Sequence, residues 1–141
     1  MKRTSLRRVS PNKVKYKKPK GQVLKKKLDV VFSKYIRHKY ADSNGNVACY
    51  TCTTVKPIAQ MQNGHWIPRN ILATRFDERN CRPQCVACNM FQRGRPDVFA
   101  VKLLEEYGGG ELKALQARRQ EIIKDFPYED LIAKYTKLLG E

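Results

Sequence analysis

The chain has 141 residues, with 29 Lys and Arg against 13 Asp and Glu, which gives a formal net charge of +16. A hydrophobic content of 41% excludes a wholly disordered chain, and the length suits one domain rather than two. No apolar run reaches the roughly 20 residues that cross a bilayer, and the charged start leads into no apolar segment of a secretory signal. We therefore expect a soluble, cytoplasmic protein that does not bind membranes.

The positive charge is concentrated early in the chain. Residues 1–28 hold twelve Lys or Arg and no acid, whereas residues 101–141 hold seven basic and eight acidic residues. A basic arm before a basic middle is typical of proteins that bind a polyanion. Residues 1–20 lack the apolar face that a membrane-surface helix needs. The charge pattern therefore favours a nucleic-acid partner.

Residues 1–21 show no hydrophobic periodicity and contain Pro11, Pro19 and Gly21, which predicts a flexible basic arm. Over residues 22–40, apolar side chains recur at helical spacing and most lysines lie off their stripe. The stripe consists of Leu24, Leu28, Val31, Phe32, Tyr35 and Ile36. We expect this amphipathic helix to pack on its own domain, with a dimer contact as the alternative.

Residues 47–92 read as short strands and loops, and the C-terminal third reads as helices. The helical patterns cover residues 97–107, 111–124 and 128–139, separated by a run of three glycines and by Pro127. We therefore expect an α+β fold, with the arm at 1–21 and a single domain at 22–141 that ends in helices over about 97–139.

Four of the five cysteines form two Cys-x-x-Cys pairs, Cys49 with Cys52 and Cys85 with Cys88. A reducing compartment disfavours disulfides, and two such pairs supply the four thiolates of a tetrahedral structural zinc site. A redox pair would need a βαβ setting that is absent, and two unrelated buried pairs are the other alternative. Cys81 is left over and is expected to be a buried thiol.

Three further residues form a polar series inside and just after this zinc loop at 47–92: His65, Asn80 and Asn89, the last directly after Cys88. The order Cys-x-x-Cys, Gly-His, Asn, Cys-x-x-Cys-Asn resembles the zinc-stapled HNH (ββα-metal, His-Me finger) nucleases. Within them, the segments Arg-Phe-Asp-Glu-Arg-Asn at 75–80 and Gln-Cys-Val-Ala-Cys-Asn at 84–89 resemble the bacteriophage NinG (Rap) recombination proteins.

The resemblance implies a ββα-metal core and a metal-dependent endonuclease that cuts branched recombination intermediates, such as Holliday junctions and D-loops, in the host cytoplasm. His65 would be the general base that deprotonates the attacking water. Asn80 would brace the loop and orient the histidine. Asn89 would be a ligand for the catalytic divalent ion, Mg²⁺ or Mn²⁺. His38, on the basic helix, is expected to lie at the surface.

One position departs from the wider superfamily, in which many enzymes place an Asp ligand just before the histidine. Gly64 stands there, as in the NinG pattern, so the metal lacks one carboxylate. Asp77 is our weak preference to supply it, with Glu78 as the alternative. Salt bridges from Asp77 to Arg79 and from Glu78 to Arg75 are equally plausible roles for these acids.

Six arginines surround the expected site in the sequence and are candidates to bind DNA phosphates: Arg75, Arg93, Arg95, Arg69, Arg79 and Arg82. Of these, Arg75 is the first choice. The aromatic residues Trp66 and Phe76 could stack on unpaired bases, although a place in the core is the stronger expectation for both.

The sequence leaves two other functions open. A non-catalytic zinc-dependent DNA-binding module explains the charge and cysteines but not the His-Asn-Asn series. An HNH nuclease that cuts by sequence would need a recognition element for base edges, and no candidate helix stands out. Symmetric cuts in a four-way junction need two active sites, so we also expect a homodimer.

Overall fold

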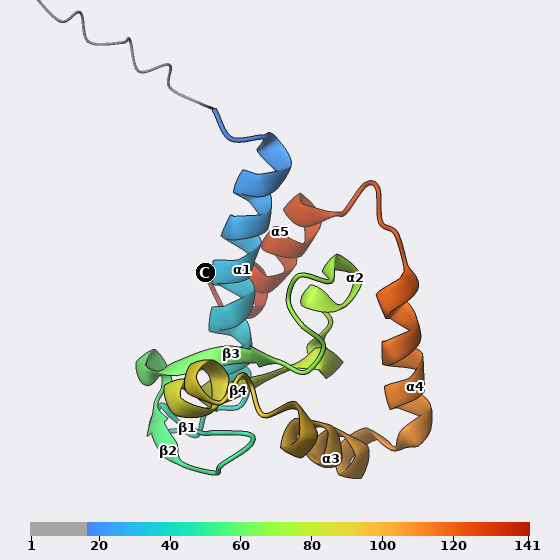
Figure 1. Cartoon of the computed structure of the whole chain (residues 1–141). Helices are drawn as coiled ribbons and strands as arrows, with labels where there is room; N and C mark the ends of the chain where they lie inside the picture. The colour runs from blue at the N-terminus through green and yellow to red at the C-terminus, as the bar shows by residue number, and fades with distance from the viewer. Residues whose placement is uncertain (1–16) are drawn as a thin grey trace, which may run out of the picture.

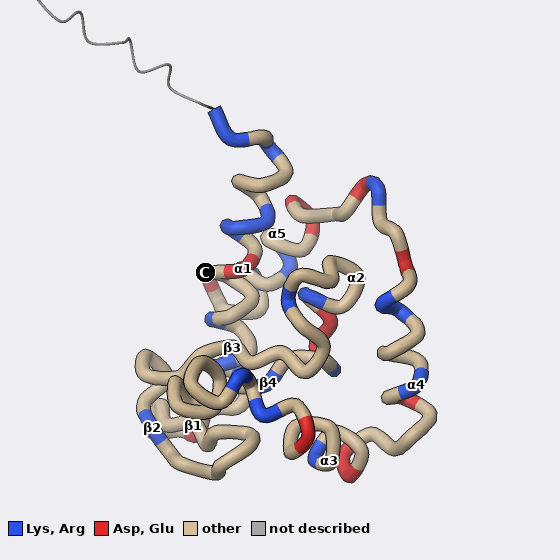
Figure 2. The backbone as a smooth tube through the Cα atoms, viewed as in Figure 1, with Lys and Arg blue, Asp and Glu red and all other residues tan. Residues whose placement is uncertain are grey.

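A long N-terminal helix supports the rest of the chain. The computed structural model describes residues 17–141, and α1 spans Lys20–Lys39, two residues earlier than the sequence pattern predicts. The expected arm at residues 1–21 lies mostly outside the described residues. Figure 2 shows basic residues along the first half of α1, which are all lysines there, and Asp29 is the only acid of that half.

Two small antiparallel sheets follow α1. Strand β1 (Asn46–Ala48) pairs with β2 (Val55–Pro57), and β3 (Met61–His65) pairs with β4 (Cys81–Cys85). The short helix α2 (Leu72–Arg75) lies in the connection between β3 and β4. The chain then forms a single π-helical turn at Ala87–Phe91, which we call the knuckle turn.

The C-terminal helices form an outer arm that returns to α1 (Figure 1). Helix α3 spans Pro96–Tyr107 and α4 spans Gly109–Ala117. The helix expected at 111–124 is thus shorter than predicted, because residues 121–127 leave helical geometry and carry the chain back across the molecule. Helix α5 (Tyr128–Leu138) then packs against α1. The expected mixed α+β character is confirmed.

The main core forms where α1, α5 and the β3–β4 connection meet. The Phe32 ring centroid lies 5.6 Å from that of Phe76 and 4.9 Å from that of Tyr135, in edge-on contacts. Cys81 is fully buried in the same cluster. The predictions that the α1 stripe packs on its own domain, that Phe76 belongs to the core and that Cys81 is a buried thiol are therefore confirmed.

Among residues 17–141, none of the helices has both the length and the apolar character needed to cross a membrane.

The contact between β3 and Gln84 explains why a glycine precedes His65. A Cβ atom at Gly64 would lie 2.0 Å from Gln84 Oε1 and 2.7 Å from its Cγ. The Gln84 side chain is fully buried, and its Nε2 donates to Thr51 Oγ1 at 3.1 Å and to the Gly94 carbonyl at 2.8 Å. A displacement of this buried amide would break its hydrogen bonds with the other two segments.

We predict that Gly64→Ala lowers the free energy of unfolding by about 1–3 kcal/mol, through overpacking against Gln84. Urea denaturation measures the change. Gly110→Ala in α4 is the matched control, since a Cβ there meets nothing within 4 Å, and it should keep or slightly raise stability. Equal stability of Gly64→Ala and the wild type would contradict this explanation.

Candidate functional site

A polar pocket of about 670 Å³ opens between α1, β3 and the knuckle turn. Each of these elements contributes side chains that can hold a ligand or a proton. Its lining includes Asp29, Asn63, His65, Arg69, Asn89 and Met90. His65 and Asn89 were expected in the site from the sequence, and the fold brings them to the same pocket.

The imidazole of His65 is fixed by a main-chain group. Its Nε2 atom lies 2.9 Å from the carbonyl oxygen of Arg75. A carbonyl oxygen only accepts hydrogen bonds, so Nε2 is the nitrogen that carries the hydrogen. In the neutral ring, Nδ1 then keeps its lone pair and is able to accept a proton.

The surroundings of His65 keep its ring neutral. Burial lowers the pKa of His65 below its usual value, and the guanidinium groups of Arg69 and Arg75 lower it further. The hydrogen bond to the Arg75 carbonyl and the charge of Asp29 act in the opposite direction but do not reverse the shift. At neutral pH the side chain is therefore in the form that a general base needs.

Arg75 links His65 to α1. Its Nε and Nη2 donate to the two carboxylate oxygens of Asp29, at 2.8 Å and 2.6 Å, and its Nη1 donates to the Arg69 carbonyl at 2.7 Å. The carbonyl of the same residue accepts from His65. Asp29 thus fixes the segment that holds the imidazole.

This arrangement gives Arg75 a structural role that the sequence did not predict. The residue is 9% exposed and its guanidinium is bound to Asp29, and a contact with DNA phosphate stays a prediction. The proposed Glu78–Arg75 pair is replaced by the pair with Asp29. The sequence analysis did not select Asp29. The available signal was that Asp29 is the only acid in the first 41 residues.

Asn80 braces the loop that carries Arg75. Its Oδ1 accepts from the Ile67 amide at 2.7 Å, and its Nδ2 donates to the carbonyls of Ile67 and Thr74 at 3.0 and 3.1 Å. The side chain is fully buried. Asn80 thus holds the backbone on both sides of the contact that His65 makes: Thr74 directly precedes Arg75, and the Trp66 N–H, next to His65, donates to the Asn80 carbonyl at 3.0 Å.

Asn89 reaches the pocket from the knuckle turn. Its Nδ2 donates to Gln62 Oε1 at 2.8 Å, which leaves the amide oxygen of Asn89 available to a ligand. Gln62 also donates to Met90 Sδ at 3.5 Å. One strand residue therefore orients two neighbouring side chains of the turn.

The structure does not bring Asp77 to this pocket. Its carboxylate accepts from Arg79 at 2.8 Å and from Arg118 at 2.7 Å, and it caps the backbone N–H of Arg79. Burial acts to raise the pKa of Asp77, but these hydrogen bonds outweigh it and hold the pKa below its usual value. The carboxylate that lines the pocket is that of Asp29, not of Asp77.

The predicted arginines fall into two groups. Arg82 is 1% exposed and binds Glu106 and the Tyr107 hydroxyl, so the expectation that it contacts DNA is not supported by its position. Arg79 is paired with Asp77 and Glu111. The exposed Arg69 and Arg93 and the partly exposed Arg95 are the members of the set that can reach a phosphate.

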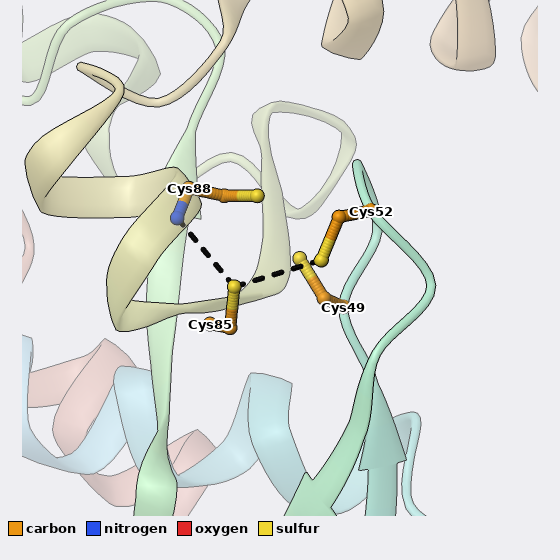
Figure 3. A group of neighbouring side chains, drawn as sticks. All are labelled: Cys49, Cys52, Cys85 and Cys88. Carbon is orange, nitrogen blue, oxygen red and sulfur yellow. Dashed lines mark hydrogen bonds between the residues drawn. The ribbon is translucent and has the colours of Figure 1, made fainter.

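The four paired cysteines form one cluster, drawn in Figure 3. Cys49 and Cys52 come from the β1–β2 turn, and Cys85 and Cys88 come from the end of β4 and the knuckle turn. Their sulfur atoms all lie within 4.8 Å of one another. Such a donor set could hold a tetrahedral metal ion such as zinc.

The pKa values of the clustered thiols shift in opposite directions: hydrogen bonds outweigh burial and lower the pKa of Cys49 to about 6. Burial raises the pKa of Cys85 to about 12, and hydrogen bonds with the neighbouring thiols contribute to the rise. Four thiolates at this separation would repel one another without a positive ion. Because Cys88 directly precedes Asn89, the cluster also sets the position of the pocket residue.

Comparison with known proteins places the chain in a family. Residues 2–139 match the family described as bacteriophage Lambda NinG protein. The chain belongs to the NinG family. The NinG protein of Salmonella phage P22 is 30% identical over 128 aligned positions, which cover 77% of this chain and 59% of the phage protein.

The NinG protein of Escherichia phage 933W is 29% identical, with coverage of 77% of this chain and 60% of the relative. The chain thus spans about three fifths of the length of the curated NinG relatives it matches. No solved structure matches it.

We predict that the purified protein holds about one zinc ion per chain, and that Cys85→Ser removes it and lowers the melting temperature. Elemental analysis of dialysed protein measures the zinc. Cys81→Ala is the control, because Cys81 lies outside the cluster and should keep the metal despite its lost core packing. Zinc bound equally by wild type and Cys85→Ser would contradict the assignment.

Proposed function

We propose that this chain is a metal-dependent endonuclease that cuts branched DNA, such as Holliday junctions and D-loops. The observation that carries the proposal is the state of His65, whose Nε2 is held by the Arg75 carbonyl and whose lowered pKa leaves Nδ1 free to accept a proton. The sequence resemblance to zinc-stapled HNH nucleases, the strand-strand-turn order of β3, β4 and the knuckle turn, and membership of the NinG family support the same reading.

The oxygen atoms around the pocket fit a hard divalent cation. Asn89 offers its amide oxygen and Asp29 contributes the carboxylate, whereas the Oδ1 of Asn63 is buried and does not open to the pocket. Asn89 would be the protein ligand, with Asp29 as the nearby negative charge. When bound, Mg²⁺ or Mn²⁺ stabilises negative charge on the scissile phosphate and the departing oxygen.

The protein's own part in the reaction is proton transfer and positioning. His65 Nδ1 takes a proton from a water molecule as its oxygen forms a bond to phosphorus, and the bond from phosphorus to the 3′ oxygen breaks. The leaving oxygen takes its proton from solvent. Arg69, exposed at the pocket, binds a phosphate oxygen and holds the strand in place.

Asp29 and Asn80 are positioning residues in this scheme. Asp29 acts through the Arg75 guanidinium and Asn80 through the Thr74 carbonyl, and both fix the loop whose next carbonyl holds the imidazole. A general base has to be held within a few tenths of an ångström of its productive position. The buried ion pair and the buried amide provide that rigidity.

The charge distribution supports DNA as the substrate, recognised by its shape rather than by its base sequence. The first half of α1 is strongly basic (Figure 2), and Arg69 and Arg93 add exposed charge beside the pocket. The zinc ion proposed for the cysteine cluster would hold the knuckle turn. Two symmetric cuts need two pockets, so we also propose a homodimer, which sedimentation at several concentrations would test.

We predict that the wild type cuts a labelled four-way junction in Mg²⁺ or Mn²⁺ and spares the matched linear duplex. Loss of the base in His65→Ala should slow cutting by about 10²-fold or more, with DNA binding retained. Gel electrophoresis of the products measures both. His38→Ala is the matched control, because His38 is exposed on α1 and should leave cutting unchanged.

Two outcomes would contradict the proposal. Tight binding without cutting in any divalent metal would make the chain a DNA-binding module. Equal cutting of junction and duplex would keep the nuclease and remove the preference for branches.

We predict that junction cutting rises with pH and levels off below neutrality, because His65 acts in its neutral form and its pKa lies below the usual 6.5. Proton NMR of the His38→Ala variant, in which His65 is the single histidine, measures this pKa directly.

Asp29→Asn provides the matching comparison, since the carboxylate of Asp29 raises the pKa of His65 and its removal should lower that pKa further. A measured value at or above 6.5 in the His38→Ala protein would contradict the lowered pKa of His65 and the pH profile that rests on it.

A further inference from the structure

The knuckle turn ends in two apolar side chains that face solvent. Phe91 is 82% exposed and the adjacent Met90 is 63% exposed. Of the aromatic residues within residues 17–141, only Phe91 falls in the exposed class. Burying a phenylalanine side chain stabilises a fold by roughly 1.5–3 kcal/mol. The exposed Phe91 does not make this contribution to the free energy of folding.

The turn that carries Phe91 is held firmly. The Gln92 N–H donates to the Ala87 carbonyl at 2.9 Å, and the Gly94 N–H donates to the Cys88 carbonyl at 2.8 Å. Met90 is tied to β3 by Gln62 Nε2. An exposed side chain on a fixed backbone loses little freedom when it binds a partner.

The backbone after Phe91 is strained in a way that turns the chain away from it. Arg93 has φ of 54° and Arg95 has φ of 45°, and Gly94 between them has φ of 82°. The left-handed region costs a non-glycine residue about 1–2 kcal/mol. These residues directly precede α3 and leave the exposed Phe91 at the corner between the knuckle turn and that helix.

The corner adjoins the candidate catalytic pocket and lies in a basic stretch. Asn89 and Met90 line the pocket with His65, and Phe91 is the next residue. No acid occurs in the sequence between Glu78 and Asp97, whereas Arg93 is exposed two residues after Phe91. An apolar ring beside arginine is the combination that binds unpaired bases of nucleic acids.

We propose that Phe91, supported by Met90, stacks on an unpaired nucleobase at the branch point of the DNA while His65 acts on a nearby phosphate. This inference rests on the proposed function and adds the residue that recognises the branch. In a linear duplex both faces of each internal base are already stacked, so the ring gains contact only where the face of a base is unstacked. The preference for branched DNA follows from that difference.

The size of the apolar surface favours a base over a protein. It consists of the two neighbouring residues Phe91 and Met90, whereas a stable protein interface buries about 800 Å² on each partner. One nucleobase covers a single phenylalanine ring. The surrounding arginine charge suits the phosphates that flank such a base.

The test uses binding without divalent metal, so that no DNA is cut. The probes are a four-way junction with 2-aminopurine at the branch point and a linear duplex with 2-aminopurine in the same sequence. Phe91→Ala should weaken junction binding by roughly 5- to 100-fold, abolish the change in 2-aminopurine fluorescence and leave duplex binding unchanged. Phe91→Trp should restore both signals. Ile122→Ala is the control, because Ile122 is apolar and 90% exposed but lies between α4 and α5.

Unchanged junction binding by Phe91→Ala overturns the proposal, as does an equal loss on junction and duplex or an equal loss in Ile122→Ala. Loss of self-association in Phe91→Ala, with the fluorescence change intact, overturns it in favour of a protein contact. The fluorescence readout does not depend on catalysis. A fluorescence change in the wild type that Phe91→Ala abolishes supports stacking even if no divalent metal gives cutting. The absence of cutting would contradict only the proposed endonuclease activity.

Discussion

The packing of α1 sets the position of nearly everything else. Leu28, Phe32 and Ile36 recur at every fourth residue and form the stripe that the core closes over. A parallel stripe one residue later, Asp29, Ser33 and Arg37, lines the candidate pocket. Neighbouring residues on a helix differ by about 100° in direction, so burial of the first stripe aims the second at His65. One helix thus supplies both the support of the core and one wall of the pocket.

The features that the sequence predicted well are those written in local spacing. Two Cys-x-x-Cys pairs were enough to anticipate the cysteine cluster, and helical periodicity located α1 and α5 closely. The place of Asn89 in the pocket also follows from its position beside Cys88. The sequence did not indicate which residues Asp29 and Arg118 would bind, because they reach Arg75 and Asp77 from segments far away in the chain. The hydrophobic periodicity of a sequence does not indicate which distant charged residue will pair with an arginine or an aspartate.

Steric contact explains why a glycine, and not an aspartate, precedes His65. The negative charge near His65 comes from another element. The buried Gln84 amide occupies the space that any side chain before His65 would need. The single carboxylate beside the pocket comes from α1 instead, where it is bound to Arg75. Negative charge is therefore present near His65, but it arrives from another element and is already engaged in fixing the loop. The chain therefore differs from the HNH pattern that it resembles both in the missing aspartate and in the element that supplies the nearby carboxylate.

Arg75 performs two tasks with different parts of one residue. Its guanidinium closes the ion pair with α1, and its carbonyl oxygen holds the imidazole of His65. A carbonyl is common to all amino acids and survives every substitution at this position. A scan of side-chain replacements would consequently classify Arg75 by its ion pair alone, and the contact closest to the imidazole would be invisible to genetics. Replacement of the 75–76 peptide bond by an ester, which weakens that carbonyl as an acceptor, is the chemical change that addresses it.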